Sequence, residues 1–511
     1  MIHPDIGCLG DAPRPFFSAS LHDGRVVTAG DASCSLGERL EHAGTHGHEG
    51  IFASWHWDGE SLTATNDRYG IYPLFYSHYG NELRISPSIA RILEGKVPRT
   101  LDYAALAVIF RLGHCVGDDT PFEHIRVLPP ASTLTWRAGE LQITANGSES
   151  RFGARQQIDF DTAVDQYIAL FDQAVARRLP RGDRFTVPLS GGRDSRHILL
   201  SLEKQGIKPS FCPTLQYRPP ATNDDMRIAG LLTQAMGIEH VQVARPASWF
   251  DAVLKDVHLT HYCGGGHSWS LPLAAHLRGR VDTLYDGLAG SVLSGGFMLD
   301  EARLALVRDG KFVALAEQLV FGSKKEGYNN TVMTKDFLAR APRELAAERV
   351  AKELARHADA GNPLLSFIFW NRTRRMVGMI PYAIMSDVPT VHCPYLDHDV
   401  FVFLTTIDPV MFLDNKLHDA AIRRGYPAFA DIPFEDKTKR AAMDADAHAY
   451  YRNSIKQFWR YLLKRGVRPS RFVRTGYLLP RVFLDLCKRR NALPWYLMST
   501  VHALELENAL D

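Results

Sequence analysis

The glycine-rich segment at residues 190–195, with the sequence SGGRDS, contains the residues of this chain best suited to chemistry. It follows the apolar run 185–189 and precedes an apolar helical pattern that starts at residue 196. Gly191 and Gly192 let the backbone approach an anion, and the main-chain N–H groups and the hydroxyls of Ser190 and Ser195 can donate to it. The segment therefore predicts a phosphate-binding turn, although it has neither a GxxxxGK[ST] nor a GxGxxG pattern.

Further candidate residues lie within the turn, at the end of the next predicted strand and after that strand. A carboxylate beside a polyphosphate requires a cation between them, so Asp194 is interpreted as a Mg²⁺ ligand. The next strand ends in Thr214 and Leu215, where adenine would meet main-chain groups in a fold of this kind. Residues 223–225 (NDD) begin the following helix, and both interpretations stay open for them: capping of the helix and binding of a ligand.

The pattern of elements along the chain predicts how these residues are positioned. Up to about residue 150, short alternating runs between Gly, Asp and Asn predict a mostly antiparallel, β-rich domain. From about 159 to 296, strand-like runs alternate with helical stretches, which predicts a parallel sheet with helices on its faces. Beyond about 300, apolar residues recur at three-to-four spacing. We therefore expect an α/β protein with domains 1–150 and 151–511, the second helical after about residue 300.

Composition narrows the classes of partner. The 511 residues are 45% hydrophobic, and 59 Lys and Arg nearly balance 57 Asp and Glu. This balance favours neither nucleic acid nor an anionic membrane as a main partner. The seven cysteines are scattered without a CxxC pair, which is typical of a reduced, cytoplasmic protein. No signal peptide and no apolar run near 18 residues is found, so we expect no membrane span.

Four motifs in the same order resemble the asparagine synthetase family. Residues 190–195 resemble the SGGxDS pyrophosphate loop of ATP-pyrophosphatases, and 66–76 (NDRYGIYPLFY) resemble RDxxGxxPLYY. Residues 285–297 (YDGLAGSVLSGGF) resemble SGDGxDELFGGY, and 393–400 (CPYLDHDV) resemble PFLDxxLV. The resemblance implies an N-terminal glutamine amidotransferase domain of the N-terminal-nucleophile type, followed by a synthetase domain that cleaves ATP between its α and β phosphates with Mg²⁺.

The chain departs from the glutamine-hydrolysing pattern. The family uses a cysteine at position 2, where this chain has Ile2, which has no nucleophilic atom. The RHRGPD and NGEIYN segments, which hold glutamine in the family, are also missing. Cys8 is interpreted as a buried thiol or as a nucleophile exposed by processing. We expect a degenerate amidotransferase domain, as in β-lactam synthetases and lasso-peptide cyclases.

The resemblance also implies synthetase residues. Ser291 stands where the family has its second metal-binding aspartate, and Asp286 aligns with the first aspartate of that motif across a one-residue gap. Lys437 or Lys439 lies about where the family has its cationic lysine, and a solvated charge run is the alternative. His392 stands near the place of a missing glutamate, and is either a base or a structural histidine.

These residues together predict an ATP-dependent carbon–nitrogen ligase with ATP and Mg²⁺ as cofactors. It would adenylate a small or peptide carboxylate and pass it to ammonia or an amine, releasing AMP and pyrophosphate. A peptide macrolactam cyclase, a β-lactam synthetase and an inactive ATP-binding scaffold are the alternatives. A second copy of the chain or an accessory biosynthetic protein is the macromolecular partner that these predictions leave open.

Overall fold

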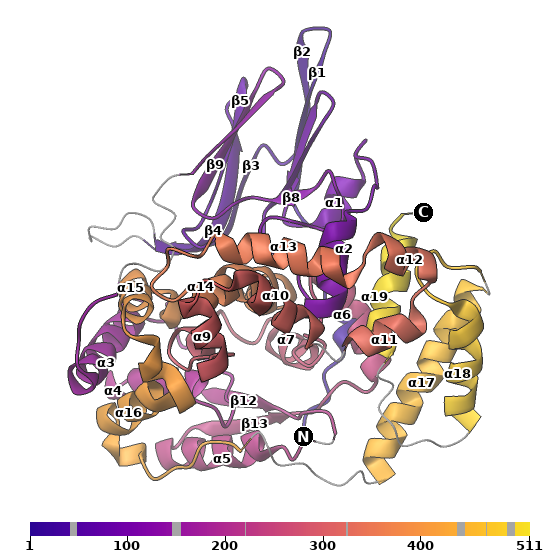
Figure 1. The fold of residues 1–511 in the computed structure, drawn as a ribbon. Helices are drawn as coiled ribbons and strands as arrows, with labels where there is room; N and C mark the ends of the chain where they lie inside the picture. Colours follow the sequence, from indigo (N-terminus) through magenta and orange to yellow (C-terminus); the bar gives the residue numbers. More distant parts are fainter. Residues whose placement is uncertain are drawn as a thin grey trace.

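The first part of the molecule consists of two antiparallel sheets. The computed structural model describes residues 1–40, 49–145, 155–219, 221–322, 325–436, 445–466, 468–487 and 496–510. In Figure 1 the two sheets stand side by side above a helical body. One has the order β2 (Arg25–Gly30), β1 (Phe17–His22), β7 (Glu82–Ser86), β6 (Phe75–Tyr79), β8 (Arg126–Val127); the other has β10 (Glu140–Ala145), β9 (Ser132–Arg137), β5 (Ser61–Asn66), β4 (Glu49–Trp57), β3 (Ser33–Leu40).

Local sequence explains the hairpins of these sheets. The turn at Gly80 and Asn81 joins β6 and β7, and Gly80 adopts a positive φ of 58°, which glycine tolerates without strain. Alternation in β5, where the residues facing the core are buried, matches the two-residue period of a strand. The helices of this part are the short η1 (Ile6–Cys8), α1 (Ile89–Leu93) and α2 (Tyr103–Leu112).

The second part is built on a parallel sheet. Its order is β13 (Glu239–Val243), β12 (Phe211–Leu215), β11 (Phe185–Thr186), β14 (Thr283–Tyr285), β15 (Thr390–His392), and every neighbouring pair is parallel. The helices that accompany it are α3 (Phe160–Ala176), α4 (Asp194–Lys204), α5 (Asp224–Met236), α6 (Trp249–Leu259), α7 (Leu271–Leu277) and α8 (Gly290–Leu293). The expected α/β architecture is confirmed, with antiparallel sheets first and a parallel sheet after them.

The chain after residue 300 is mainly helical, as expected, but it also supplies the edge strand β15. Three residues are too few for a recognisable alternation, so this strand was not expected. The expected boundary near residue 150 falls outside the described residues and stays a prediction. The elements are α9 (Glu301–Arg308), α10 (Phe312–Phe321), α11 (Lys325–Val332), α12 (Lys335–Arg340), α13 (Arg343–Ala355), α14 (Pro363–Phe367), η2 (Ile368–Val377), η3 (Ile380–Ile384), η4 (Pro394–Leu396), α15 (His398–Thr406), η5 (Pro409–Asn415), α16 (Lys416–Gly425), η6 (Pro427–Phe429), α17 (Ala445–Arg465), α18 (Thr475–Cys487) and α19 (Leu497–Asn508).

Aromatic contacts and a buried ion-pair network join the two parts. The ring of Tyr69 lies 4.9 Å from that of Phe401, centroid to centroid. Arg178, which is buried, binds Glu49 of β4 at 3.1 Å and Asp397 at 2.6 Å. One continuous apolar core contains residues of both parts, so the antiparallel sheets are packed on the helical body rather than tethered to it.

The N-terminal segment lies against the parallel sheet. Ile2 forms a parallel bridge with Val243 at the outer edge of β13; its N–H donates to the Gln242 carbonyl at 2.8 Å, and its own carbonyl accepts from Ala244 at 2.7 Å. Cys8 lies in η1, which contacts α7. Neither residue lies on the antiparallel sheets, whose first strand opens at Phe17.

Candidate active site

The SGGRDS segment forms a tight turn between β11 and α4. The Ser190 N–H donates to the Ser195 hydroxyl at 3.2 Å, and the Gly192 N–H donates to the Ser190 hydroxyl at 3.1 Å. The Gly191 N–H donates to a carboxylate oxygen of Asp225 at the start of α5. An anionic oxygen therefore already occupies a main-chain donor of this turn, which is the chemistry that a phosphate oxygen would use.

Asp194 is wedged between this turn and the glycine-rich segment that follows β14. A Cβ atom on Gly287 would lie 2.8 Å from the Asp194 Cβ, and a Cβ on Gly290 would lie 2.6 Å from its carboxyl carbon. Only glycine fits at these two positions. The Asp194 side chain remains 29% exposed, with the His418 Nδ1 3.7 Å from one carboxylate oxygen. The two motifs that the sequence singled out are therefore brought together around one accessible carboxylate.

Asp286 lies at the carboxyl end of β14, and its N–H donates to the His392 carbonyl at 2.9 Å. Burial raises the pKa of its carboxyl group to about 6, against a main-chain hydrogen bond from Leu288 that lowers it. Ser291 lies on α8. Within the described ranges no three His, Cys, Asp or Glu side chains form a metal-binding group. The role of Asp194 as a Mg²⁺ ligand stays a prediction.

The residues expected near adenine are buried strand residues. Thr214 is 1% exposed and its hydroxyl lies 3.0 Å from the His240 Nε2, while Leu215 is paired with Val243 in the ladder. The Thr214 side chain is therefore turned toward β13. A role of the main chain of Thr214 and Leu215 in adenine binding stays a prediction.

Lys437 and Lys439 lie outside the described residues, but the segment that leads to them is fixed on the phosphate turn. The Glu435 N–H donates to the Gly191 carbonyl at 2.8 Å. The buried Arg196 donates to the carbonyls of Ile432 and Pro433, and its guanidinium lies 4.4 Å from the ring of Phe434. The chain up to residue 436 is thus held beside the turn, and the roles of Lys437 and Lys439 stay predictions.

Two contacts beside these motifs involve residues that the sequence analysis missed. Tyr217, whose ring lies 6.3 Å from that of Trp269, also hydrogen-bonds Asp225. The Arg372 guanidinium lies 4.3 Å from the ring of Phe297, which directly follows the second glycine-rich segment. The aromatic residues gave no motif, and their proximity is created only by tertiary packing.

Arg372 differs from the other arginines of its helix. It lies on the π-helix η2, a conformation often found at functional sites. Arg375 donates to the carbonyls of Gly117 and Asp119, and Arg374 donates to that of Leu128. Arg372 makes no hydrogen bond or ion pair with any residue in the described part of the chain, and burial lowers its pKa. It is therefore a cation suited to an anionic group of a ligand.

Asp256 holds the loop that precedes Trp269. Its buried carboxylate accepts from the N–H groups of Gly266 and His267, both at 3.0 Å. Burial raises its pKa to about 7, although these main-chain bonds lower it. Because this folded pKa lies above the unfolded value of about 3.9, the wild type loses stability as the pH rises from about 4 to about 7 and loses no more above that range.

We therefore expect Asp256→Asn to become more stable relative to the wild type as the pH is raised from about 5 to about 8. Two pKa units correspond to about 3 kcal/mol in the difference between the two unfolding free energies. Urea denaturation at both pH values measures this difference, with the exposed Asp161→Asn as the control. A difference that does not change with pH would contradict the assignment.

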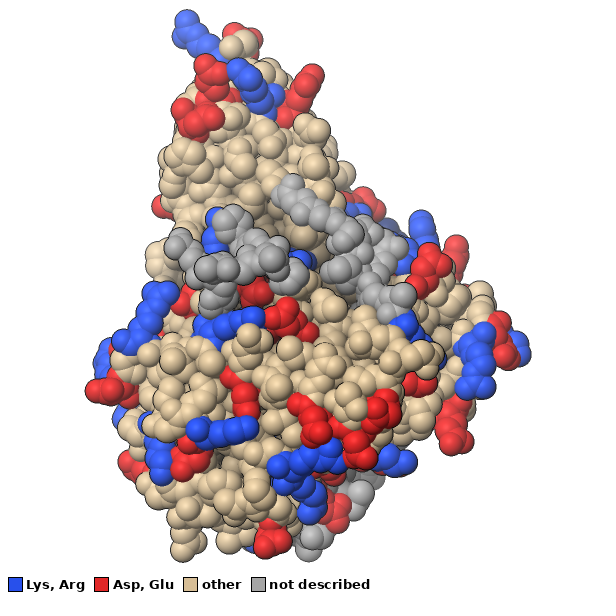
Figure 2. Space-filling model, turned by 90° about the vertical axis from the view of Figure 1, so that its left-hand side faces the viewer, with Lys and Arg blue, Asp and Glu red and all other residues tan. Residues whose placement is uncertain are grey.

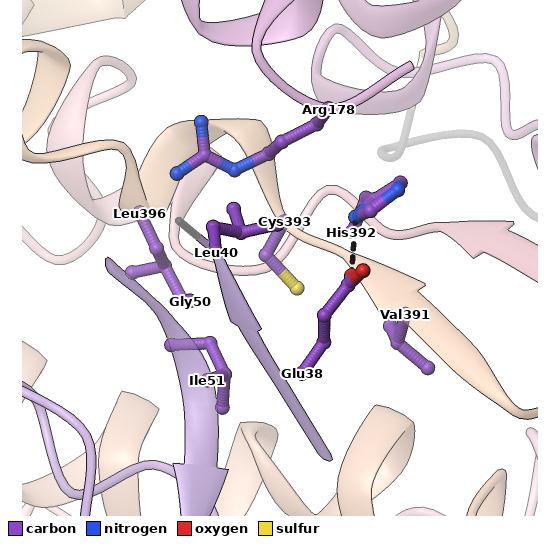
Figure 3. A pocket seen from close by; sticks show the side chains of 9 residues that line it. All are labelled: Glu38, Leu40, Gly50, Ile51, Arg178, Val391, His392, Cys393 and Leu396. Atoms are coloured by element: carbon purple, nitrogen blue, oxygen red, sulfur yellow. Dashed lines mark ion pairs between the residues drawn. The ribbon is translucent and has the colours of Figure 1, made fainter. Parts of the chain in front are cut away.

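The junction between β3 and β15 contains a small enclosed cavity, drawn in Figure 3. The cavity has room for about one water molecule. The His392 Nδ1 lies 3.2 Å from a Glu38 carboxylate oxygen, and Arg178 and Cys393 also face the cavity. Burial and the nearby Arg178 and Arg181 lower the pKa of His392 to about 3, so its ring is neutral.

The structure also assigns the neighbours of His392. Its ring is directed toward Glu38 of the antiparallel sheets, so it is placed at the junction rather than at the phosphate turn. Asp387, slightly upstream, forms an ion pair with Arg278 at 3.2 Å. The interpretation of Cys8 as an exposed nucleophile of the amidotransferase domain is not supported by its position in η1, against α7.

The surface carries charges of both signs. Figure 2 shows Lys, Arg, Asp and Glu side chains intermingled over the lower body and gathered at the tip of the upper part. Among the helices that the structure describes, none has both the length and the apolar character needed to cross a membrane.

Comparisons with known proteins agree with the motifs. Residues 28–146 match a glutamine amidotransferase domain family. The chain is 29% identical over 208 residues to asparagine synthetase [glutamine-hydrolyzing] 3 of Bacillus subtilis (strain 168). The match covers 37% of this chain and 34% of that relative, so the chain spans about a third of the length of the relative it matches. Over the matched residues, the chain is related to the asparagine synthetase-like family.

Proposed function

We propose that the protein is an ATP-dependent ligase that adenylates a carboxylate and transfers it to an amine, releasing AMP and pyrophosphate. The observation that carries this proposal is the phosphate turn, in which the Gly191 N–H binds a carboxylate oxygen while Asp194 lies against Gly287 and Gly290. Relatedness to an amidotransferase ligase family supports the same class of reaction.

The residues of the turn fit the triphosphate of ATP. The N–H groups at positions 190–192 and the hydroxyls of Ser190 and Ser195 are clustered at the start of α4, where the helix dipole favours an anion. Asp225 must leave the Gly191 N–H when a phosphate oxygen binds there. Asp194 is the residue that would hold Mg²⁺, which when bound supplies positive charge to the departing pyrophosphate.

Arg372 and Trp269 would hold the acid. Arg372 supplies a positive charge without a carboxylate partner among the described residues, and Trp269, which is 37% exposed, supplies an apolar face. Asp286, at the carboxyl end of the neighbouring strand, is the residue we propose as a further site carboxylate. Burial raises its pKa to about 6, closer to neutral pH than that of an ordinary carboxyl group, and such shifts are common at functional sites.

The nitrogen would not come from glutamine hydrolysed by this chain. Ile2 lies on the edge of the parallel sheet and Cys8 against α7, so neither provides a nucleophile on the antiparallel sheets. The degenerate amidotransferase domain would then act by packing on the synthetase part, through the Arg178 network and the junction at Glu38 and His392.

The test is acid-dependent exchange of labelled pyrophosphate into ATP, measured across a library of carboxylic acids. We expect at least one acid to raise exchange well above the background without acid. ATP binding without exchange by any acid would favour an inactive scaffold. A product lighter than its substrate by one water would favour a cyclase or β-lactam synthetase within the same ligase class.

A further inference from the structure

A cavity of about 480 Å³ lies apart from the phosphate turn and the second glycine-rich segment. It is lined by residues 9–14 before β1, by the start of α1, by one side of α6 and by the loop that follows α6. None of its lining residues belongs to segments 190–195 or 286–297. Its volume falls within the range of pockets that bind small molecules.

Much of the lining is aliphatic. Leu9, Leu254 and Leu259 contribute side chains to the wall, and Leu9 and Leu259 are at most 8% exposed. Ala90 of α1 also lines the cavity and is exposed, so its methyl group faces open space. A predominantly apolar wall with a few polar groups is typical of a site for an organic ligand.

The charged side chains that line the cavity are two carboxylates, Asp11 and Asp251, and two cations, Arg14 and Lys255. Lys255 lies 3.9 Å from Asp11, and the His258 Nε2 lies 2.6 Å from Glu505. The Asp251 side chain is hydrogen-bonded by Ser248 and Gln457. Lys255 therefore offsets the charge of Asp11, whereas the Asp251 carboxylate is stabilised by neutral donors.

Arg14 has no ionic partner among the described residues. It is half-buried and donates to the Ala383 carbonyl at 3.1 Å, but no carboxylate of the described residues balances its charge. A guanidinium removed from water without a counter-charge costs free energy, and binding of an anion reduces that cost. Its planar fork of N–H donors is suited to a carboxylate or a phosphate.

The backbone beside the cavity is strained. His261 and Tyr262 are consecutive non-glycine residues with φ of 55° and 60°. This turn places the His261 ring edge-on to Phe75, and the Tyr262 hydroxyl 3.2 Å from the His258 Nδ1. Such conformations cost about 1–3 kcal/mol each, and they concentrate at ligand sites. The wall is therefore held in an unfavourable conformation by its surroundings.

We infer that this cavity is a second ligand site, distinct from the nucleotide site, that binds a small amphiphilic anion. Arg14 would bind the carboxylate or phosphate end, and the aliphatic part would lie against Leu9, Leu254 and Leu259. Because the cavity is lined by α1 and α6, an occupant would contact both the antiparallel part and the synthetase part.

The test is calorimetric titration of the full chain with hexanoate, hexyl phosphate and hexylamine, which share one apolar tail and differ in charge. The variants are Arg14→Gln, which removes the charge, and Ala90→Trp, which fills the cavity from its exposed rim. Arg137→Gln is the control, because Arg137 is 68% exposed in its side chain and pairs only with Glu60.

We expect at least one of the two anions to bind the wild type and Arg137→Gln with a Kd near or below about 1 mM. Binding should weaken by about tenfold or more in Arg14→Gln and in Ala90→Trp. The anion that binds more tightly shows whether the site prefers a carboxylate or a phosphate. Equal binding by Arg14→Gln, binding of hexylamine as tight as that of the anions, or no saturable binding of either anion would overturn the inference.

The outcome does not depend on the proposed ligase activity. Binding of Mg²⁺–ATP to each variant is measured in a separate titration. Arg14→Gln should bind Mg²⁺–ATP as the wild type does. Anion binding without acid-dependent exchange would support this site and contradict the proposed function. Exchange without anion binding would do the reverse.

Discussion

Asp194→Ala should lower acid-dependent AMP formation by about 10²- to 10³-fold or more, because loss of one preorganised electrostatic contact to a transition state costs that much. The carboxylate is accessible at the point where the phosphate turn and the second glycine-rich segment meet. It is the only acid of the SGGRDS turn, so no neighbour within the turn replaces it.

The fold should tolerate the same change. As the first residue of α4, Asp194 contributes about 0.3–1 kcal/mol through the helix dipole. Its main-chain carbonyl still accepts from the Tyr395 hydroxyl at 3.3 Å, because that contact does not involve the side chain. The expected loss of stability is thus small beside the loss of activity, which corresponds to about 3–4 kcal/mol.

The matched control is Asp161→Ala, which removes an exposed acid from the first turn of α3, far from the turn in sequence. It should change stability by a similar small amount and leave AMP formation intact. Quenched-flow or end-point AMP measurement, with urea denaturation of both variants, decides the matter. AMP formation by Asp194→Ala at the wild-type rate would remove the metal assignment.

The SGGRDS turn between a strand and a helix could be predicted because its information is local. Strand, glycines and helix follow one another within about twenty residues, and the order of motifs then predicts a parallel sheet with these loops at its carboxyl ends. The bond from Gly191 to Asp225 could not be predicted, since it joins residues 34 positions apart. Residues 223–225 allowed either a cap or a ligand, and the structure gives Asp225 a contact with the turn.

Other parts of the site depend on packing that no local pattern encodes. The pair Glu38 and His392 joins residues from the two parts of the chain. Arg372 has neighbours of the same type in sequence, but Arg374 and Arg375 bind main-chain carbonyls whereas Arg372 lies over the ring of Phe297. The position of Ile2 on the edge of β13 likewise follows from a single isolated bridge. That Ile2 has no nucleophilic atom was visible in the sequence, whereas its bridge to Val243 was not.

The source of nitrogen gives the second large effect. With glutamine as the sole nitrogen donor we expect at least about 100-fold less amide than with ammonium or with the correct amine, because Ile2 has no nucleophilic atom and Cys8 lies against α7 rather than on the antiparallel sheets. Glutamate should not appear above background. The small cavity at the junction, which is lined by Glu38, Arg178 and His392 among others, has room for about one water molecule.

Ammonium and an amine of the substrate, the two alternative nitrogen sources, predict different observations. With ammonium as the donor, the rate should rise with pH as more NH₃ is present. With an amine of the substrate itself, one organic substrate should suffice and the product should be lighter by one water. In both cases we expect release of AMP to require the amine, because a site that excludes water protects the adenylated acid from hydrolysis.

The decisive quantity is the ratio of AMP to amide with the acid identified by pyrophosphate exchange, measured with and without added amine. A ratio near one with amine, and little AMP without it, is the expected result. Cys8→Ala is the control for a hidden glutaminase and should change nothing. Glutaminase activity that disappears in Cys8→Ala would reinstate that thiol as a nucleophile. Rapid AMP turnover without any amine would contradict amide formation and show that water, rather than an amine, receives the activated acid.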